Sequence, residues 1–325
     1  MTEPESRALG FTWGDYVDGL VAREGSLVAV AERLAATKSY EEDVGSIERG
    51  LRRLRARGST PGGKWGSRLL ALFGLPGDVQ ARLRWMAFYH SRFTDLPVPV
   101  CEDLVRLWDH PPTNDRGDSR VWLGLARTSI ALRRSDFARA LELIEQLERD
   151  LDHAPVEARI EFLLVRAFIA SKRDTDRVPE LLGAIGPLLP KVSDADERAC
   201  LEVRWIDQRA YDLNSGLRGR PDHAAAEALY RGVPSDGLPP FVLCRRANGL
   251  AYARFKQGDL DQAANFAREA AAHAGDGGHV RLRVMALGML SRIEPRESRA
   301  CARAVEMSRR LEDELLLSRL EPPRR

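Results

Sequence analysis

Residues 244–275, CRRANGLAYARFKQGDLDQAANFAREAAAHAG, decide how this chain folds. Their apolar spacing predicts two helices, and the pair Gly258-Asp259 between them predicts a tight turn. Small residues stand where the two helices must touch. One pair of helices cannot bury its own apolar face, so we expect neighbouring copies along the chain.

Four further segments repeat this scheme more loosely. Each has a helical pattern, a short turn, and a second helical pattern. The copy at 157–190 departs most, because Pro179 interrupts its second helix near the start. We therefore predict about five helical hairpins within residues 115–325. The four segments are 119–150, 157–190, 198–232 and 281–317.

The hairpin pattern resembles the tetratricopeptide repeat (TPR), a unit of about 34 residues with small residues at fixed helical positions. The tryptophan and tyrosine that the family often places in its first helix, and its closing proline, are missing. The resemblance implies an all-α solenoid that binds a protein or peptide and performs no catalysis. The residues that carry it are Leu250, Ala251, Gly258, Asp259, Leu260, Ala263 and Ala270.

In that family the first helices of the hairpins line a concave groove, and the resemblance places two sets of side chains there. An asparagine with arginine and lysine beside it suits a peptide backbone or an acidic C-terminal tail. Plain helix packing is the alternative, above all for the aromatic members. The residues are Gln208, Tyr211, Ser215 and Arg218 from one hairpin, and Arg245, Asn248, Tyr252, Phe255 and Lys256 from the next.

The first 114 residues follow a different plan. Glycine and proline divide them into short helical patterns, and Pro111-Pro112 in the polar segment 109–118 ends this domain because proline donates no backbone hydrogen bond. In the pattern 78–93, the aromatic residues at 85, 88 and 89 are predicted to share one face and to pack in the core. Stacking on a nucleic acid or a partner is the alternative, because arginines are interleaved with them at 82, 84 and 92. The expected helices are at about 12–23, 26–37, 43–57, 65–73, 78–93 and 98–108.

Charge is segregated within this N-terminal domain. Residues 1–48 carry 4 basic and 10 acidic side chains, whereas residues 49–94 carry 10 basic and one acidic. The whole chain has a formal net charge of +2, so only the local field indicates a nucleic-acid surface. On the helix 43–57, arginines surround a buried apolar stripe on its other sides. The candidate DNA-binding residues are Arg49, Arg52, Arg53, Arg55, Arg57 and Lys64.

The helices at 26–37 and 43–57 resemble the two core helices of a helix-turn-helix or winged-helix domain, whose second helix enters the major groove of duplex DNA. The segment 58–66 would then be a wing or a phosphate-contacting loop. Two features depart from the pattern: the connection is several residues too long, and acidic residues at 41–43 open the second helix, where they repel phosphates. A solvated basic helix in an ordinary bundle, or a surface that docks an acidic protein, are the alternatives.

Signals for catalysis are weak. Residues 58–64 match the GxxxxGK pattern of a phosphate-binding loop, but Trp65 stands where a hydroxyl should hold Mg²⁺, and no strand pattern precedes them. The six histidines are scattered, and no metal-binding or nucleophile motif occurs. We therefore expect no enzyme, no cofactor and no metal. The four cysteines, predicted to be buried free thiols in a reducing compartment, are Cys101, Cys200, Cys244 and Cys301.

Composition and the N-terminus add the cellular context. The chain is 44% hydrophobic, which excludes a disordered protein, and it lacks a leader peptide or an apolar run of membrane-spanning length. We therefore expect a cytoplasmic protein without a membrane partner. The order of a small helical N-terminal domain followed by TPR-like hairpins resembles that of bacterial helix-turn-helix plus TPR regulators. The resemblance implies a transcriptional regulator that binds DNA and a peptide or protein. The alternative is a scaffold or adaptor that joins two proteins and binds no nucleic acid.

Overall fold

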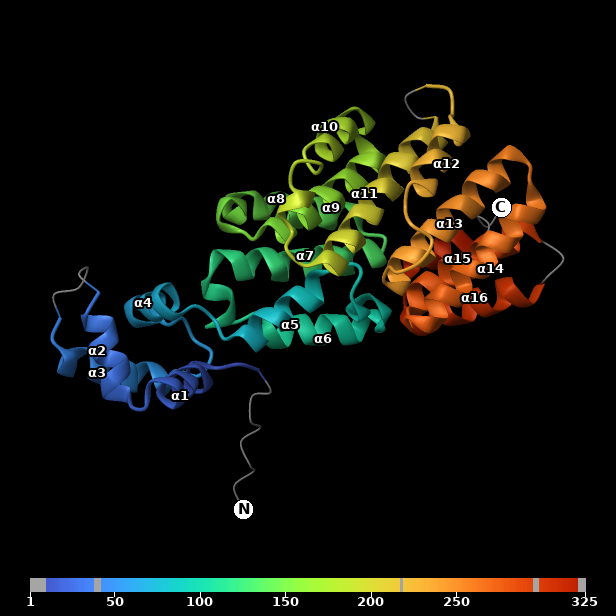
Figure 1. Cartoon of the computed structure of the whole chain (residues 1–325). Coiled ribbons are helices and arrows are strands. Elements are labelled where there is room, and N and C mark those ends of the chain that lie inside the picture. Colours follow the sequence, from blue (N-terminus) through green and yellow to red (C-terminus); the bar gives the residue numbers. More distant parts are fainter. Residues whose placement is uncertain (1–9, 38–41, 217–218, 295–297, 321–325) are drawn as a thin grey trace, which may run out of the picture.

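The computed structural model describes residues 10–37, 42–216, 219–294 and 298–320 (Figure 1). These residues form 17 α-helices and five short 3₁₀ helices, with no strand among them. The all-α class predicted from the sequence is therefore confirmed. Helices α1–α4 lie at one end of the molecule, and the helices from α5 onward form a larger body. The short 3₁₀ helices are η1 (Arg92–Asp95), η2 (Thr113–Asp115), η3 (Leu147–His153), η4 (Thr175–Arg177) and η5 (Leu189–Lys191).

Polar side chains start three of the four helices in the N-terminal unit. Thr12, Ser26 and Asp43 each accept a hydrogen bond from a backbone N–H in the first turn of the helix that follows. Trp13 is fully buried between the helices, and its indole nitrogen donates to the carbonyl of Thr60 at 2.9 Å. The helices are α1 (Trp13–Glu24), α2 (Leu27–Ala35), α3 (Val44–Arg55) and α4 (Gly63–Phe73).

The segment expected to form a wing instead enters α4, which places Lys64 in the first turn of a helix. Two glycines allow Trp13 to lie against this segment. A Cβ atom on Gly62 or Gly66 would come within 2.2 or 2.6 Å of the indole ring. The second half of the segment, residues 63–66, is therefore helical and not a wing, because it packs closely against Trp13, whereas residues 58–62 form a turn that leads into α4.

The next two helices pack on the first hairpin. Helices α5 (Gly77–Ala87) and α6 (Val98–Trp108) both contact α7 (Gly117–Arg133). One cluster of buried apolar residues extends from Trp13 in α1 to Ile169 in α9, across the predicted division at residue 114. The N-terminal helices and the first hairpins therefore share a continuous core.

Helix α5 ends earlier than predicted, and this moves one aromatic residue to a new place. Phe88 has an extended backbone, so the helix stops at Ala87. Phe88 packs edge-on against Trp122 of α7, with ring centroids 5.0 Å apart. Tyr89 then turns away from that core and lies among arginine side chains of α11, α13 and α15. The prediction of one shared aromatic face is wrong because the helix does not continue through residue 93.

Ten helices after residue 115 form five consecutive hairpins that contact their neighbours (Figure 1). The second helix of the second hairpin has only six residues, but Pro179 does not interrupt it, because it lies in the first turn, where proline is tolerated. The pairs are α7 with α8 (Phe137–Gln146), α9 (Val156–Arg173) with α10 (Val178–Gly183), α11 (Ala195–Ser215) with α12 (His223–Arg231), α13 (Pro240–Gln257) with α14 (Leu260–Asp276), and α15 (Val280–Ile293) with α16 (Ser298–Leu311).

An aspartate in the turn starts the second helix in three hairpins. Asp136, Asp222 and Asp259 each accept a hydrogen bond from the backbone N–H three residues later. Gly258 has a φ of 86°, the left-handed conformation that ends α13. Small side chains then let the paired helices approach closely. The fully buried alanines beyond the turns include Ala140, Ala226, Ala263 and Ala270.

The described chain ends in α17 (Glu314–Leu320), which returns to the first hairpin and contacts α7 as well as α15 and α16. The buried carboxylate of Asp313, just before α17, accepts hydrogen bonds from Arg133 of α7 at 3.0 Å and from Arg281 of α15 at 2.8 Å. The first and last hairpins are therefore joined. The resemblance implied a concave groove, and these contacts close the row of hairpins around it.

The cysteines are free thiols, but only three of them are buried. Cys301 on α16 is half-buried, so the prediction of burial is wrong at this position. No helix in the described part of the chain combines the length and the apolar character needed to cross a membrane.

Candidate functional site

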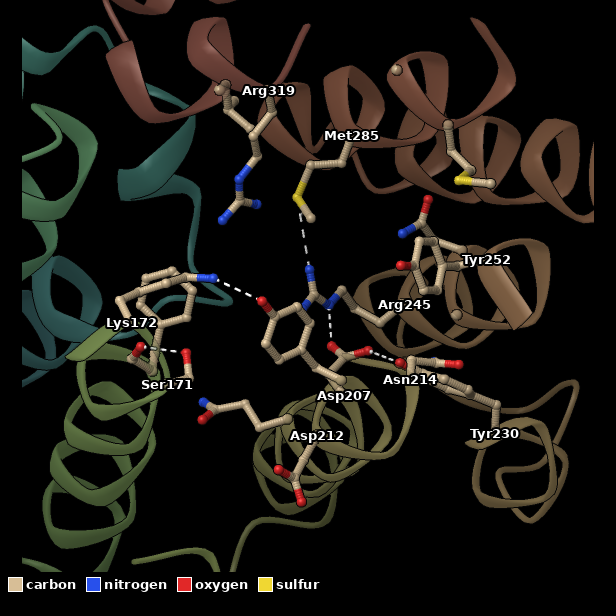
Figure 2. Close-up of a pocket in the computed structure, with 18 of the residues that line it drawn as sticks. Ser171, Lys172, Asp207, Asp212, Asn214, Tyr230, Arg245, Tyr252, Met285 and Arg319 are labelled. Carbon is tan, nitrogen blue, oxygen red and sulfur yellow. Dashed lines mark hydrogen bonds and ion pairs between the residues drawn. The ribbon is translucent and has the colours of Figure 1, made fainter. Parts of the chain in front are cut away.

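The inner helices of four hairpins and α17 enclose a cavity of about 420 Å³ (Figure 2). Sites for small molecules usually occupy about 300–1,000 Å³ and combine apolar walls with a few convergent polar groups. This cavity has the same mixed character. Its aromatic and apolar wall includes Phe168 of α9, Tyr211 of α11, Tyr252 of α13, Met285 and Met289 of α15, and Leu316 and Leu320 of α17.

Five of the residues predicted for a groove line this cavity: Gln208, Tyr211, Arg245, Asn248 and Tyr252. Phe255 and Lys256 do not, because they lie in the last turn of α13, beyond the cavity. Phe255 packs with the apolar cluster between α13, α14 and α15, and the Lys256 ammonium lies over the Tyr252 ring at 5.6 Å. Ser215 is not part of the lining, and Arg218 lies outside the described residues.

A chain of polar contacts holds Arg245 in the cavity wall. The hydroxyl of Tyr230 donates to the carboxylate of Asp207 at 2.9 Å, and the same carboxylate pairs with Arg245. Burial raises the pKa of Asp207 above its usual value, although Arg245 opposes the shift. Gly249 makes room for this chain, since a Cβ atom there would lie 2.1 Å from the Tyr230 ring. Within the described chain, the Nη1 atom of Arg245 donates only to the sulfur of Met285 at 3.7 Å, and a thioether sulfur is a weak acceptor.

Lys172 and Arg319 also line the cavity, and neither forms an ion pair with a carboxylate among the described residues. The Lys172 ammonium donates to the hydroxyl of Tyr211 at 2.9 Å and lies over its ring. The guanidinium of Arg319 makes no hydrogen bond within the described chain. Partial loss of hydration, with Arg281 and Arg245 nearby, lowers the pKa of Arg319. Figure 2 shows the charged ends of Lys172, Arg245 and Arg319 directed toward the same space.

A smaller compartment of about 130 Å³ adjoins the cavity and has Tyr89 in its wall. The guanidinium groups of Arg204, Arg281 and Arg245 lie 4.7, 5.0 and 5.8 Å from the centre of the Tyr89 ring. Burial would raise the pKa of Tyr89, but these positive charges outweigh it and lower that pKa. The two compartments share the lining residues Phe168, Gln208, Arg245, Met285 and Arg319.

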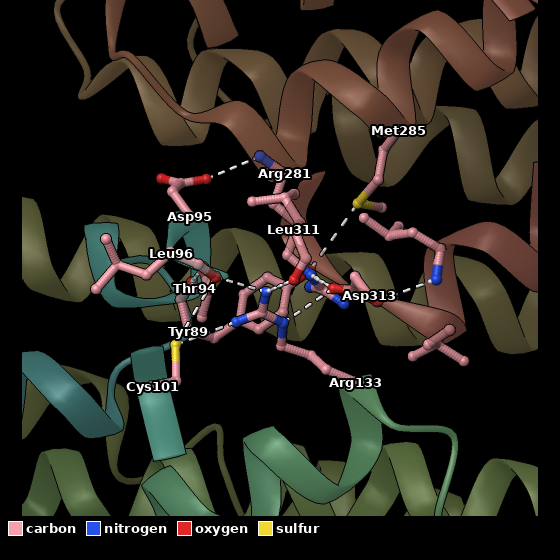
Figure 3. A network of polar contacts seen from close by, with 12 residues as sticks. Tyr89, Thr94, Asp95, Leu96, Cys101, Arg133, Arg281, Met285, Leu311 and Asp313 are labelled. Atoms are coloured by element: carbon pink, nitrogen blue, oxygen red, sulfur yellow. Dashed lines mark hydrogen bonds and ion pairs between the residues drawn. The ribbon is translucent and has the colours of Figure 1, made fainter. Parts of the chain in front are cut away.

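Figure 3 shows the polar network at the base of the smaller compartment. Arg133 is fully buried, and besides Asp313 it donates to the carbonyls of Leu96 at 2.7 Å and Leu311 at 3.2 Å and to the sulfur of Cys101 at 3.3 Å. Burial would raise the pKa of Asp313, but Arg281 and Arg133 lower it below its usual value, so the carboxylate is ionised. This network joins α7, α15 and α17, and its role is structural.

Sequence reasoning missed Tyr89, Arg133, Arg204, Arg281 and Arg319. These residues come from five separate helices or turns, and only the closed arrangement of hairpins brings them together. One signal was present in the sequence. Arginines stand on the apolar faces of inner helices, where a charged side chain needs a partner or a function.

The six predicted DNA-binding residues all have exposed side chains, but several are engaged within the N-terminal unit. Arg57 donates to the carbonyl of Pro61 at 2.7 Å. Arg49 and Arg53 on α3 have no ion-pair partner within the described chain. The ion pairs are Arg52 with Glu48 at 2.6 Å, Arg55 with Asp18 at 2.6 Å, and Lys64 with Glu42.

Comparison with known proteins assigns neither a family nor a function to the chain. A scan against protein-family models and a search of curated proteins each gave no match to the chain. Within the described residues, no group of three or more histidine, cysteine or acidic side chains is placed to hold a metal ion. The candidate site is therefore the cavity and its cationic wall.

Proposed function

We propose that the protein is a non-enzymatic regulator in which α1–α4 bind duplex DNA and a TPR-like solenoid, closed by α17, binds a regulatory ligand. One observation carries the proposal: the cavity combines an apolar wall with three convergent cations, Lys172, Arg245 and Arg319. Binding sites have this composition. The resemblance to helix-turn-helix plus TPR regulators suggests a peptide. A volume of about 420 Å³ favours a small molecule or the end of a peptide over a folded partner.

The DNA-binding part of the proposal is supported by the packing and charge of the N-terminal unit. Helices α1, α2 and α3 contact one another, and α3 follows α2 as a recognition helix follows the first core helix. Arg49 and Arg53 project from α3 into solvent, where a phosphate backbone could pair with them.

A salt titration of duplex binding tests this part. With labelled duplex of mixed sequence and fluorescence anisotropy as the readout, six phosphate contacts should give a log–log slope of affinity against salt of about −5. The double variant Arg49→Glu/Arg53→Glu should abolish binding, whereas Arg310→Glu on α16, far along the chain and exposed, should not change it. No duplex binding at low salt by the unmodified protein would remove the DNA-binding role.

An adaptor without nucleic-acid binding is the second candidate, and one observation favours it. Acidic side chains of the N-terminal unit already neutralise half of the six candidate cations. That pairing weakens the field that a phosphate backbone would meet. The salt titration separates the two functions, because only the regulator predicts binding to duplex DNA at low salt.

A further inference from the structure

The two compartments carry an excess of positive charge in their walls. Among the described lining residues, seven are lysine or arginine and three are aspartate or glutamate. Adding the buried carboxylate of Asp313, which pairs with Arg133 and Arg281 behind the wall, still leaves more cations than anions. The buried arginines of these walls are paired, whereas Lys172 and Arg319 are exposed to solvent and have no carboxylate partner among the described residues. A local excess of positive charge at an accessible cavity attracts a ligand of the opposite sign.

The excess charge is not explained by structural ion pairs alone. Arg133 and Arg281 bond Asp313 and so hold the ends of the hairpin row together, and Arg204 pairs with Glu161. Those three arginines have structural roles. Arg319 has none of these contacts, although its side chain enters the cavity from α17 and is accessible there.

Free hydrogen-bond donors gather where the two compartments meet. Arg245 and Arg319 line both compartments, and among the described residues the Nη1 donor of Arg245 has only the sulfur of Met285 as a partner. Arginine donors are arranged to hold the oxygens of a carboxylate or phosphate in pairs. On the other side of this junction, the larger compartment offers Tyr252, Met289 and the leucines of α17 as an apolar wall.

We propose that the cavity binds a small amphiphilic anion, with its carboxylate or phosphate group between Arg245 and Arg319 and its apolar part in the larger compartment. This assignment rests on the proposed ligand-binding function and names its ligand class. Lys172 is the third cation at the rim and contributes attraction at longer range, because its ammonium already bonds the hydroxyl of Tyr211. The apolar part explains the aromatic and thioether residues of the wall, which an inorganic anion alone would not need.

Calorimetric titration of the full-length protein with four probes tests the proposal: octanoate, octyl phosphate, octanol and inorganic phosphate. We expect at least one of the two amphiphilic anions to bind about tenfold more tightly than octanol, because a charge-assisted hydrogen bond is stronger than a neutral one. Whichever of octanoate and octyl phosphate binds more tightly then identifies the head group as a carboxylate or a phosphate. Either should also bind more tightly than inorganic phosphate.

Variants of Arg319 test the assigned contact. Arg319→Gln should weaken the better anionic probe about tenfold and leave octanol unchanged, and Arg319→Lys should restore part of the affinity. Arg310→Gln, an exposed arginine of α16 paired with Glu306, is the matched control and should have no effect. Thermal melting of each variant reports whether its fold is intact.

Three results would overturn the proposal, and they are distinguishable from failure of the wider function. Equal affinity for octanol and both anions would leave a ligand cavity but remove the anion site. Inorganic phosphate that binds as tightly as octyl phosphate would remove the role of the apolar wall. Absence of binding by every probe would remove the ligand class altogether. The DNA titration uses residues of α3 and is unaffected by any of these results.

Discussion

Replacing Asp313 with asparagine should open the closed row of hairpins. The carboxylate is fully buried and is shared by Arg133 and Arg281, which are themselves almost fully buried. Asparagine has nearly the same shape and is equally able to accept the hydrogen bond that Leu316 donates at the start of α17. Asp313→Asn therefore removes the charge and keeps the cap. Two buried guanidinium groups lose their counter-ion.

Removing one partner of a buried ion pair typically lowers the free energy of unfolding by about 3–5 kcal/mol. We expect a loss in this range for Asp313→Asn, measured by urea denaturation. Because α17 depends on this contact, its backbone amides should also exchange with solvent faster, measured by hydrogen exchange. Asp103→Asn is the control, since its pair with Arg106 is exposed and should contribute less than about 1 kcal/mol.

The reasoning is refuted if Asp313→Asn loses no more stability than the control and α17 exchanges at the wild-type rate. That result would mean that apolar contacts of α17 close the row without help from charge. Asp313→Ala measures the contribution of the helix cap separately. It removes the cap of α17 as well as the charge, so this variant should be less stable than Asp313→Asn by about 0.5–2 kcal/mol.

Three other predictions concern the packing of single side chains. Burial, with Arg204 and other cations nearby, lowers the pKa of His90 from its ordinary 6.5 to about 3. Between these two pH values the imidazole is protonated in the unfolded chain and neutral in the folded one. Stability should therefore fall as the pH drops from 6.5 toward 3, and His90→Phe should reduce that slope by up to about 1.4 kcal/mol per pH unit in urea melts. Gly249→Ala places a methyl group against the Tyr230 ring and should destabilise the folded protein by about 1–3 kcal/mol. The control Gly275→Ala, which has open space around it in α14, should be neutral or stabilise the protein by up to about 1 kcal/mol. Equal effects of the two substitutions would contradict the described packing. Cys301 alone should react with a thiol reagent in the folded protein, and all four cysteines should react after unfolding.

The local elements were predictable because they depend on neighbouring residues. Gly258 and Asp259 define a turn through a left-handed φ and a helix cap, and both signals lie within four residues of the helix ends they determine. Pro179 likewise lies in the first turn of α10, where its missing N–H leaves no intrahelical hydrogen bond unmade. Such effects act over one turn of helix, and a single sequence displays them directly.

The site was only partly predictable because its residues meet through long-range packing. The repeat pattern placed Arg245 and Asn248 on an inner helix face, and both line the cavity. It gave no indication that Tyr89 would leave α5 and lie beside them, since that depends on a single extended residue at position 88. It also gave no indication of Arg319, whose position depends on the return of α17 to α7.

Helix α17 connects the closure of the molecule to the proposed ligand. Its cap residue Asp313 holds the two ends of the hairpin row, and six residues later Arg319 supplies the cation that we assign to the anion site. A ligand bound to Arg319 stabilises α17 in place, and by linkage anything that releases α17 must weaken the ligand. Asp313→Asn should therefore lower the affinity for the anionic probe although residue 313 does not line the cavity. An affinity that is unchanged in this variant would show that closure and binding are independent.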